Sequence, residues 1–555
     1  MRAPLNNIRA SRSPMRQKSV AGSRVSATAP VPAPVGGWDA VSPLAQMPAD
    51  RAVTLDNWFP QPGYIEVRRG YIPYCIGASD GPIESLMIYN ASTALASRMF
   101  AAAADSIYDV TTLGSAISSA TGFSSARWQY TNFATAGGHF LVCVNGQDAP
   151  QNYDGTNWTA PSITGTGITA SNFINVNAHK NRLWFVIRDS MDAAYLPTNS
   201  ISGSASKFPL GAVCGKGGYL VAMTTWTHDG GNGPDDYAVF ITSRGQVAVY
   251  QGDDPSSSSS WALVGVYDMG PPIGHRCFTK VAGDVALVNI DGVLPLSRAL
   301  TTDRGAAIGI AITGNINNAM NVAAQNYKDN FGWELVPFAK GTMAILNVPV
   351  AELSSAHQYV MNTLTGAWCR FTGWNANCFA VLNDTLYFGG NEGIVNQAWT
   401  GSADNEDEID AVGQTAYQYF NGRGRLKQFK MIQPLLTANV TSRPAVGIST
   451  DFKDNAALGI PTSAASVGAV YGTAVYDSSV YAEELETFTD WTSVTGLGYA
   501  ASVHFRARSG LGEDNALWDR AFWDYSAVWS AGGDSTEVTM RINAFNLIME
   551  NGEFL

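Results

Sequence analysis

The residues best suited to chemistry in this sequence lie in one acidic loop. Asp229-Gly-Gly-Asn-Gly-Pro-Asp-Asp236 gathers carboxylate and amide oxygens around glycines, and such oxygens are the ligands that a calcium ion prefers. The same residue types also form ordinary solvated turns. The sequence leaves a calcium ion and a plain turn as alternatives for this loop, and we assign no metal to it.

The cysteines and histidines indicate no catalytic or metal site. The cysteines contain no CxxC pair and lie mostly in apolar, strand-like surroundings, which predicts buried free thiols in a chain assembled in a reducing cytosol. They are Cys75, Cys143, Cys214, Cys277, Cys369 and Cys378. No pair of histidines has the close spacing of a zinc site. We expect no catalytic residue, no cofactor and no enzymatic activity.

Positive charge is concentrated at the start of the chain. Residues 1–30 contain six basic residues and no acid: Arg2, Arg9, Arg12, Arg16, Lys18 and Arg24. Since the whole chain carries −12 and this stretch +6, the remainder carries −18. We predict that residues 1–32 form a flexible basic arm that docks on a negative partner, either an acidic protein surface or DNA. A passive tail without a partner is the alternative.

Strands and tight turns account for most of the rest of the chain. The stretches 237–250 and 284–297 each place β-branched and aromatic residues on both sides of a turn containing glycine, the pattern of a β-hairpin. Similar hairpins follow one another from about residue 97 to 400, and only Asn315–Tyr327 has helical periodicity. Repeated hairpins at this spacing predict an all-β protein whose residues 33–400 form a β-propeller of six or seven blades. A long array of β-sandwiches is the alternative.

A change of charge marks the next boundary. Asp404-Asn-Glu-Asp-Glu-Ile-Asp410 is followed by a basic stretch from Arg423 to Lys430. This change predicts a separate domain over residues 401–555, although a solvated loop before an edge strand would look alike. Alternation at 501–508 and 537–543 predicts a β-sandwich-like platform. An aromatic cluster between Trp518 and Trp529 is expected to belong to its core.

The stretch between the arm and the first hairpin resembles a known family. Gly36-Gly37-Trp38, then Asn57-Trp-Phe-Pro60, then a strand that ends in Arg68-Arg-Gly-Tyr71 resembles the opening of the tail nozzle proteins of short-tailed bacteriophages, the tail tubular protein B or packaged-DNA-stabilisation group. Further similar motifs extend the resemblance over roughly residues 33–400. They include Asn181-Arg-Leu-Trp-Phe185, Gly265-Val-Tyr-Asp-Met-Gly-Pro-Pro-Ile-Gly274 and Asn362-Thr-Leu-Thr-Gly-Ala-Trp368. None of these motifs is catalytic, and each is a turn or strand pattern that is common by itself. The resemblance therefore depends on the order of the motifs along the chain.

The resemblance implies a structural protein of the virion. Members of the group form a ring, commonly a homohexamer, in the short tail below the portal and adaptor, and double-stranded DNA passes through its channel. The expected partners are the tail adaptor and tail fibres or spikes, with assembly in the host bacterial cytoplasm before DNA ejection. An acidic body suits such a conduit, because each phosphate contact would have to be broken as DNA slides. The connectors Ser200–Gly218 and Asp253–Trp261 are candidate gate loops.

Two other functions are compatible with parts of the sequence. Asn152-Tyr-Asp-Gly-Thr-Asn-Trp158 vaguely resembles the Asp-box of sialidase propellers, but the chain lacks that family's Arg-Ile-Pro opening and a regular series of such boxes. A simple Asp-Gly turn explains the match. The stronger alternative is a tail protein that binds a host receptor or glycan through Trp and Tyr residues on loops. No apolar run is long enough to span a bilayer, so we expect no membrane-spanning segment.

Overall fold

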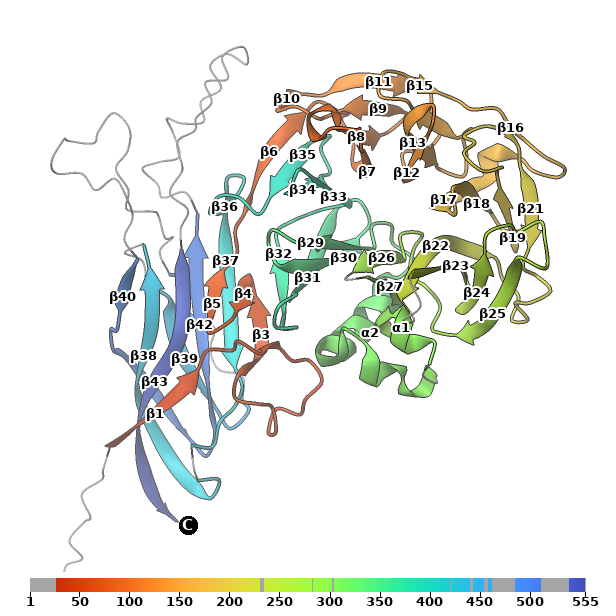
Figure 1. The fold of residues 1–555 in the computed structure, drawn as a ribbon. Helices are drawn as coiled ribbons and strands as arrows, with labels where there is room; N and C mark the ends of the chain where they lie inside the picture. The colour runs from red at the N-terminus through yellow and green to blue at the C-terminus, as the bar shows by residue number, and fades with distance from the viewer. Residues whose placement is uncertain are drawn as a thin grey trace, which may run out of the picture.

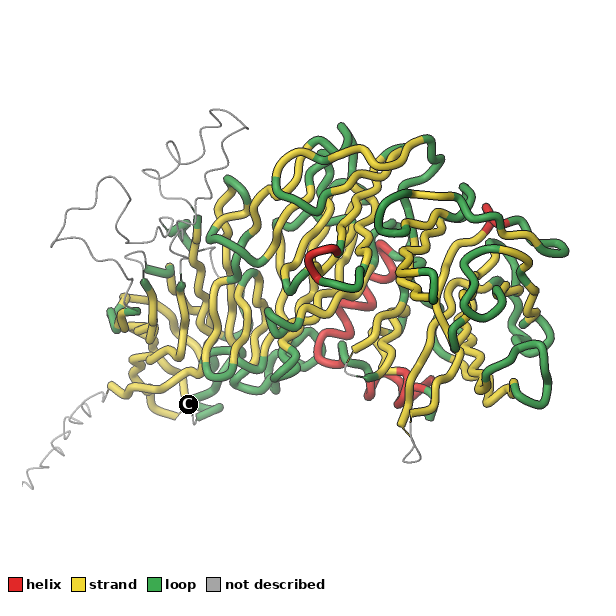
Figure 2. The backbone as a smooth tube through the Cα atoms, turned by 45° about the horizontal axis from the view of Figure 1, so that its top comes forward, coloured by secondary structure: helices red, strands yellow, loops and turns green. Residues whose placement is uncertain are grey.

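Strands and loops make up nearly the whole molecule (Figure 2). The computed structural model of the 555-residue chain describes residues 26–229, 234–281, 283–301, 304–420, 422–439, 443–453, 458–461, 485–510 and 539–554. Figure 1 shows two bodies, a ring of small sheets and a second body of long strands, which we call the platform. The all-β prediction is confirmed.

Four four-stranded antiparallel sheets and one three-stranded sheet follow one another around the ring, each with its first strand innermost (Figure 1). The first sheet holds β7 (Ile83–Tyr89), β8 (Arg98–Ala103), β9 (Ser106–Asp109) and β11 (Ile117–Thr121), and the second holds β12 (Gln129–Thr135), β13 (Gly138–Val144), β14 (Gln151–Tyr153) and β15 (Trp158–Thr159). The third holds β17 (Phe173–His179), β18 (Arg182–Ile187), β19 (Asp192–Tyr195) and β21 (Ser206–Pro209), and the fourth holds β22 (Leu220–Asp229), β23 (Pro234–Thr242), β24 (Gln246–Gly252) and β25 (Trp261–Asp268). The fifth holds β26 (Phe278–Val281), β27 (Asp284–Asn289) and β28 (Gly292–Pro295).

Two further four-stranded ladders complete the ring and belong to a larger, fifteen-stranded sheet that continues into the platform. The sixth ladder consists of β29 (Glu334–Phe338), β30 (Met343–Ala351), β31 (Ser355–Asn362) and β32 (Trp368–Thr372). The seventh consists of β33 (Cys378–Leu382), β34 (Thr385–Gly389), β35 (Val395–Ala398) and β6 (Tyr71–Ile76). Because β6 precedes the first blade in the chain and pairs with β35 of the last, it fastens the ring shut. This arrangement is a β-propeller.

The platform contains the beginning and the end of the described chain. Its N-terminal strands are β1 (Ser26–Pro32), β2 (Gly37–Trp38), β3 (Arg51–Asp56), β4 (Trp58–Gln61) and β5 (Tyr64–Val67). Its C-terminal strands are β36 (Ala403–Asp404), β37 (Asp407–Thr415), β38 (Arg425–Ala438), β39 (Ala445–Thr450), β40 (Glu486–Phe488), β41 (Thr492–Gly498), β42 (Ala501–Ser509) and β43 (Met540–Phe554). β1 and β5 pair with β43, and β3 pairs with β37.

The predicted boundary at residue 33 is therefore wrong: the propeller begins at Tyr71, and residues 33–67 belong to the platform. The predicted arm is also shorter than residues 1–32, since residues 26–32 form β1. Both errors have the same physical cause. Alternation along a strand shows that it pairs, but the partner lies hundreds of residues away and leaves no local mark in the sequence.

The local predictions inside the ring are confirmed. The hairpins at 237–250 and 284–297 are β23–β24 and β27–β28. Gly245 in the first turn has φ +77°, and a Cβ there would lie 2.3 Å from the carbonyl oxygen of Met269, so only glycine fits. The predicted helix is α2 (Asn317–Tyr327), which follows the short α1 (Leu296–Ala299) and buries Met320 and Ala323. All six cysteines are buried and free.

Several predicted features lie outside the described residues. They are the six basic arm residues, the aromatic cluster at 518–529, and Gly230–Gly233 of the candidate calcium loop. Within the described ranges, no helix is long and apolar enough to cross a membrane.

Candidate functional site

Arg68 occupies the joint between the propeller and the platform. It lies between β5 and β6, where the chain passes from one body to the other, and it is only 2% exposed. Its guanidinium forms a bidentate ion pair with Asp404, with Nη1–Oδ1 and Nη2–Oδ2 distances of 2.8 and 2.5 Å. Nη2 also donates to the carbonyl oxygen of Thr372 at 2.5 Å. A buried charge is tolerated when it is paired and hydrogen-bonded in this way, so these contacts fix how three distant segments meet.

Asn57 completes the joint from the platform side. Its Oδ1 accepts hydrogen bonds from Nε of Arg68 and from the backbone N–H of Thr372, at 2.8 and 2.9 Å. Its Nδ2 donates to the carbonyl oxygen of Asp410 at 2.8 Å. Asn57 has φ +58°, a conformation that asparagine tolerates better than most residues. Gly70 is equally constrained, because a Cβ there would lie 1.7 Å from the carbonyl oxygen of Ala403.

The joint is continuous with the main hydrophobic core. One cluster of buried side chains contains Trp58 and Phe59 of the platform together with Phe371 and Trp374 beside the sixth blade. The guanidinium of Arg68 lies 5.6 and 5.3 Å from the ring centres of Phe371 and Trp374. The shared core and the buried ion pair hold the propeller and the platform in a fixed relation to each other.

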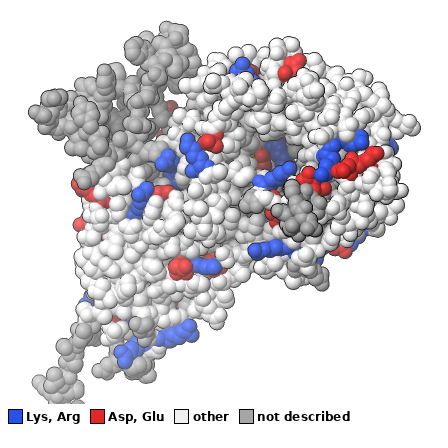
Figure 3. Space-filling view, viewed as in Figure 1, with Lys and Arg blue, Asp and Glu red and all other residues white. Residues whose placement is uncertain are grey.

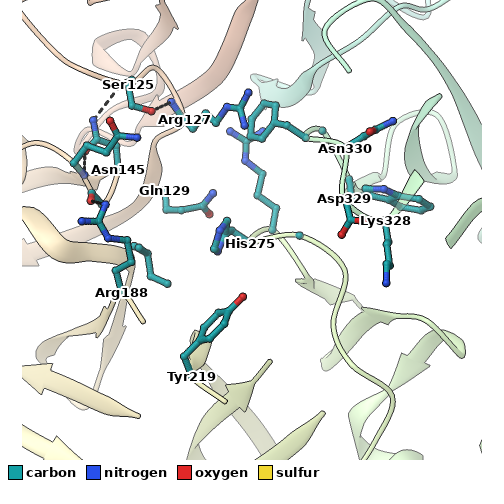
Figure 4. A pocket seen from close by; sticks show the side chains of 18 residues that line it. Ser125, Arg127, Gln129, Asn145, Arg188, Tyr219, His275, Lys328, Asp329 and Asn330 are labelled. Carbon is teal, nitrogen blue, oxygen red and sulfur yellow. Dashed lines mark hydrogen bonds between the residues drawn. The ribbon is translucent and has the colours of Figure 1, made fainter. Parts of the chain in front are cut away.

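A second candidate site is a hollow at one mouth of the propeller channel (Figure 4). Its volume is about 460 Å³, and 18 residues line it. They come from the beginnings of the inner strands of the second to sixth blades and the segments that lead into them, and from the turns after β13 and β18. These positions converge because inner strands surround the axis of a propeller.

Arg276 lines the hollow and contacts blades that are distant in the chain. It precedes β26 in the fifth blade, yet its Nη2 donates to the carbonyl oxygen of Glu84 at 2.9 Å and to Oγ of Ser85 at 2.8 Å in the first blade. Its Nη1 also pairs with Glu334 of the sixth blade at 3.1 Å. One side chain therefore connects blades on different sides of the axis. Burial raises the pKa of Glu334, although the Arg276 guanidinium opposes the shift.

Arg127 and Phe331 complete the floor of the hollow. Arg127 forms ion pairs with Glu84 and Glu352 at 2.6 and 2.7 Å. Both guanidinium groups contact the Phe331 ring, whose centre lies 4.3 Å from that of Arg127 and 5.2 Å from that of Arg276. Such cation–π contacts add to the ion pairs. The floor thus sets two guanidinium groups against the three carboxylates of Glu84, Glu334 and Glu352.

The structure brings together residues that the sequence did not single out. Glu84, Arg127, Arg276 and Glu334 meet in space but are spread over 250 positions without periodicity. Each of these charged residues lies at or near the beginning of an inner strand. This common position can be recognised only after the strands have been assigned to blades. The predicted docking residues, Arg2 to Arg24, lie outside the described residues.

The Asp-box-like segment forms the turn between β14 and β15. Oδ1 of Asp154 accepts hydrogen bonds from the backbone N–H groups of Thr156 and Asn157, at 2.8 and 2.7 Å. These bonds lower the pKa of Asp154. The segment therefore has the chemistry of a turn.

Comparisons with known proteins bear on the fold alone. No family model and no curated protein matches the chain. The β-propeller domain of Cps50 (Swd1) from Myceliophteria thermophila is 11% identical, with a TM-score of 0.38 over 60% of this chain and 99% of that one. YCF48 bound to D1 peptide is 9% identical, with a TM-score of 0.36 over 64% and 99%. The computationally designed Ika8 protein is 11% identical, with a TM-score of 0.35 over 59% and 100%. At these TM-scores the likenesses carry no argument about function.

Proposed function

We propose that the protein is a structural component of a bacteriophage virion, a subunit of the ring-shaped nozzle of a short tail. The nozzle would serve as conduit and gate for packaged DNA during retention and ejection. One observation carries the proposal. Asn57, Arg68 and Gly70, which belong to the stretch that resembles the nozzle group, are the residues that build the buried joint. The resemblance thus falls on residues that hold two bodies in a fixed relation, as a load-carrying ring requires.

The small size of the hollow in each chain supports a conduit formed between copies. A hollow of about 460 Å³ above a floor crossed by Arg276 has the size of a small-molecule site. A DNA duplex, whose major groove alone is about 12 Å wide, cannot pass through it. DNA would therefore run along an axis around which several copies are arranged. Contacts between unlike surfaces close into such a ring when the rotation allows it, and the resemblance implies six copies.

The distribution of charge also favours a conduit. On the face shown in Figure 3, basic and acidic side chains adjoin one another in small groups and form no broad basic patch. Arg508 pairs with Glu408 at 2.6 Å, and Arg506 pairs with Asp410. Basic groups already paired with carboxylates bind phosphates weakly, so DNA would meet little resistance as it advances.

The gate is assigned to loops of the third and fourth blades. The segments Ser200–Gly218 and Asp253–Trp261 lie at the end of the propeller remote from the platform (Figure 1). The first contains β20 (Gly203–Ser204) and β21, the outer strand of the third blade, so only the residues beside these strands are loop. In the second, Oδ1 of Asp254 accepts hydrogen bonds from N–H and Oγ of Ser256, at 3.1 and 2.8 Å. Asp253 and Asp254 also form ion pairs with Lys180 and Arg182 of the third blade, at 3.7 and 3.4 Å. Such partly exposed pairs contribute little energy, so the turn could rearrange without disturbing the core.

The copy number per particle tests the proposal. Native mass spectrometry of the concentrated protein, together with electron microscopy of virus particles in which this chain is labelled, should show a closed ring of several copies in the tail. A single copy per particle would end the proposal. A peripheral position combined with binding of host glycan by the isolated chain would favour the receptor-binding alternative.

A further inference from the structure

Two of the cationic side chains that line the hollow have no carboxylate partner among the described residues. Four cationic residues and one carboxylate, Asp329, line it. Arg127 and Arg276 are paired with glutamates of the floor, whereas no carboxylate in the described part of the chain forms an ion pair with Arg188 or Lys328. The hollow and its floor therefore have no net positive charge, and attraction for an anion is local to the side chains of Arg188 and Lys328. A ligand with a single, well-placed negative group suits this arrangement.

The guanidinium of Arg188 is positioned to bind a negatively charged group of a ligand. Its Nη1 donates to the carbonyl oxygen of Gly146 at 2.6 Å, and its Nη2 donates to Oδ1 of Asn172 at 3.2 Å. Both acceptors are neutral, so they orient the guanidinium without removing its charge. A guanidinium still has unused N–H groups after two such bonds, and a planar carboxylate matches their geometry.

The remaining wall is rich in neutral hydrogen-bonding groups. Gln129, His275 and Tyr219 occupy the centre and lower wall of the hollow, and the Tyr219 hydroxyl is directed toward the centre (Figure 4). Loss of hydration, and then the guanidinium groups of Arg276 and Arg127, lower the pKa of His275. It is therefore neutral at pH 7, where it offers one donor and one acceptor. Such amide, imidazole and phenol groups match ligand hydroxyls.

We propose that this hollow binds an acidic sugar, a compact ligand with one carboxylate and several hydroxyl groups. The carboxylate would pair with Arg188, and the hydroxyls would meet Gln129, His275 and Tyr219. The volume of about 460 Å³ is in the range of known small-ligand sites, about 300–1,000 Å³. The aromatic ring of Tyr219 offers apolar surface for a face of the sugar ring. This ligand site is independent of a role in DNA passage.

Calorimetric titration of the full chain tests the proposal. The probes are glucuronate, its methyl glycoside as a mimic of a chain-linked residue, and neutral glucose. We expect saturable binding of glucuronate or its glycoside, and none of glucose. R188Q should weaken that binding by about tenfold to a hundredfold, because it removes a hydrogen-bonded charge pair. Q129L should weaken it by about threefold to tenfold, because it removes neutral hydrogen bonds.

The matched control is K280Q, which removes an exposed lysine near the other end of β26, away from the hollow, and should leave affinity unchanged. Binding of the glycoside as well as of glucuronate would indicate that a polysaccharide is the source, and binding of glucuronate alone would indicate the free sugar. Three results would each overturn the proposal: no saturable binding of either acid, equal binding of glucose, or unchanged affinity in a correctly folded R188Q protein.

Discussion

Replacing Arg68 by methionine should loosen the propeller from the platform. Methionine fills similar volume but leaves the carboxylate of Asp404, a residue 4% exposed, without its ion-pair partner. It also removes the hydrogen bonds that Arg68 donates to Thr372 and Asn57. Removing one partner of a buried ion pair costs about 3–5 kcal/mol, and we expect R68M to lower the free energy of unfolding by that amount.

Denaturant unfolding followed by tryptophan fluorescence measures this loss. Trp374 is a suitable reporter because its ring centre lies 5.3 Å from the Arg68 guanidinium. The matched control is K207M, which breaks the ion pair with Asp192 between side chains 39% and 27% exposed. Exposed pairs of this kind contribute about 0.2–1 kcal/mol. A loss in R68M no larger than in K207M would refute the reasoning.

A double variant separates the charge from the packing. In R68M/D404L both charges are absent, so no unpaired charge remains buried. The combined loss should be smaller than the sum of the losses in R68M and D404L, because contacting residues are not additive. Simple addition of the two single losses would show that the ion pair does not act as a unit.

Two further predictions concern the arm and a buried histidine. Deleting residues 2–25, a stretch that ends before β1, should leave the fold intact and abolish attachment to an acidic patch on the tail adaptor. Normal attachment with leakage of packaged DNA would identify DNA as the partner, whereas unchanged attachment and unchanged DNA retention would contradict docking on the adaptor and on DNA alike. Burial lowers the pKa of His179 from 6.5 to about 4. Below pH 6.5 the unfolded chain therefore binds a proton that the folded chain does not, and the free energy of unfolding falls by up to about 3 kcal/mol as the pH approaches 4. Thermal unfolding at pH 7.5 and 4.5 should show this loss in the natural protein and in the exposed control H139Q, and a smaller loss in H179Q; an equal loss in H179Q would contradict it.

Sequence reasoning succeeded where the signal is local. The hairpins β23–β24 and β27–β28 and the helix α2 depend on turn residues and periodicity within a dozen positions. It also predicted a further β-rich body at the C-terminus, which the structure confirms, but it missed the N-terminal strands of that body, because β1 and β43 pair from opposite ends of the described chain. The joint was visible only as a motif: Arg68 and Asp404 are 336 positions apart, and nothing in the sequence connects them. The hollow was missed for the same reason, since its lining comes from five blades.

The pairing of β1 with β43 also sets the order in which a newly made chain can fold. The propeller closes when β6 meets β35, so the ring can form while later residues are still being synthesised. The platform cannot be completed until Met540–Phe554 has left the ribosome, because β43 lies between β38 and the N-terminal strands β1 and β5. A prematurely terminated chain would therefore carry a closed propeller and an unfinished platform with exposed strand edges. If neighbouring copies contact one another through the platform, such terminated chains would be excluded from the ring. Assembly would then admit only chains that have been synthesised through β43.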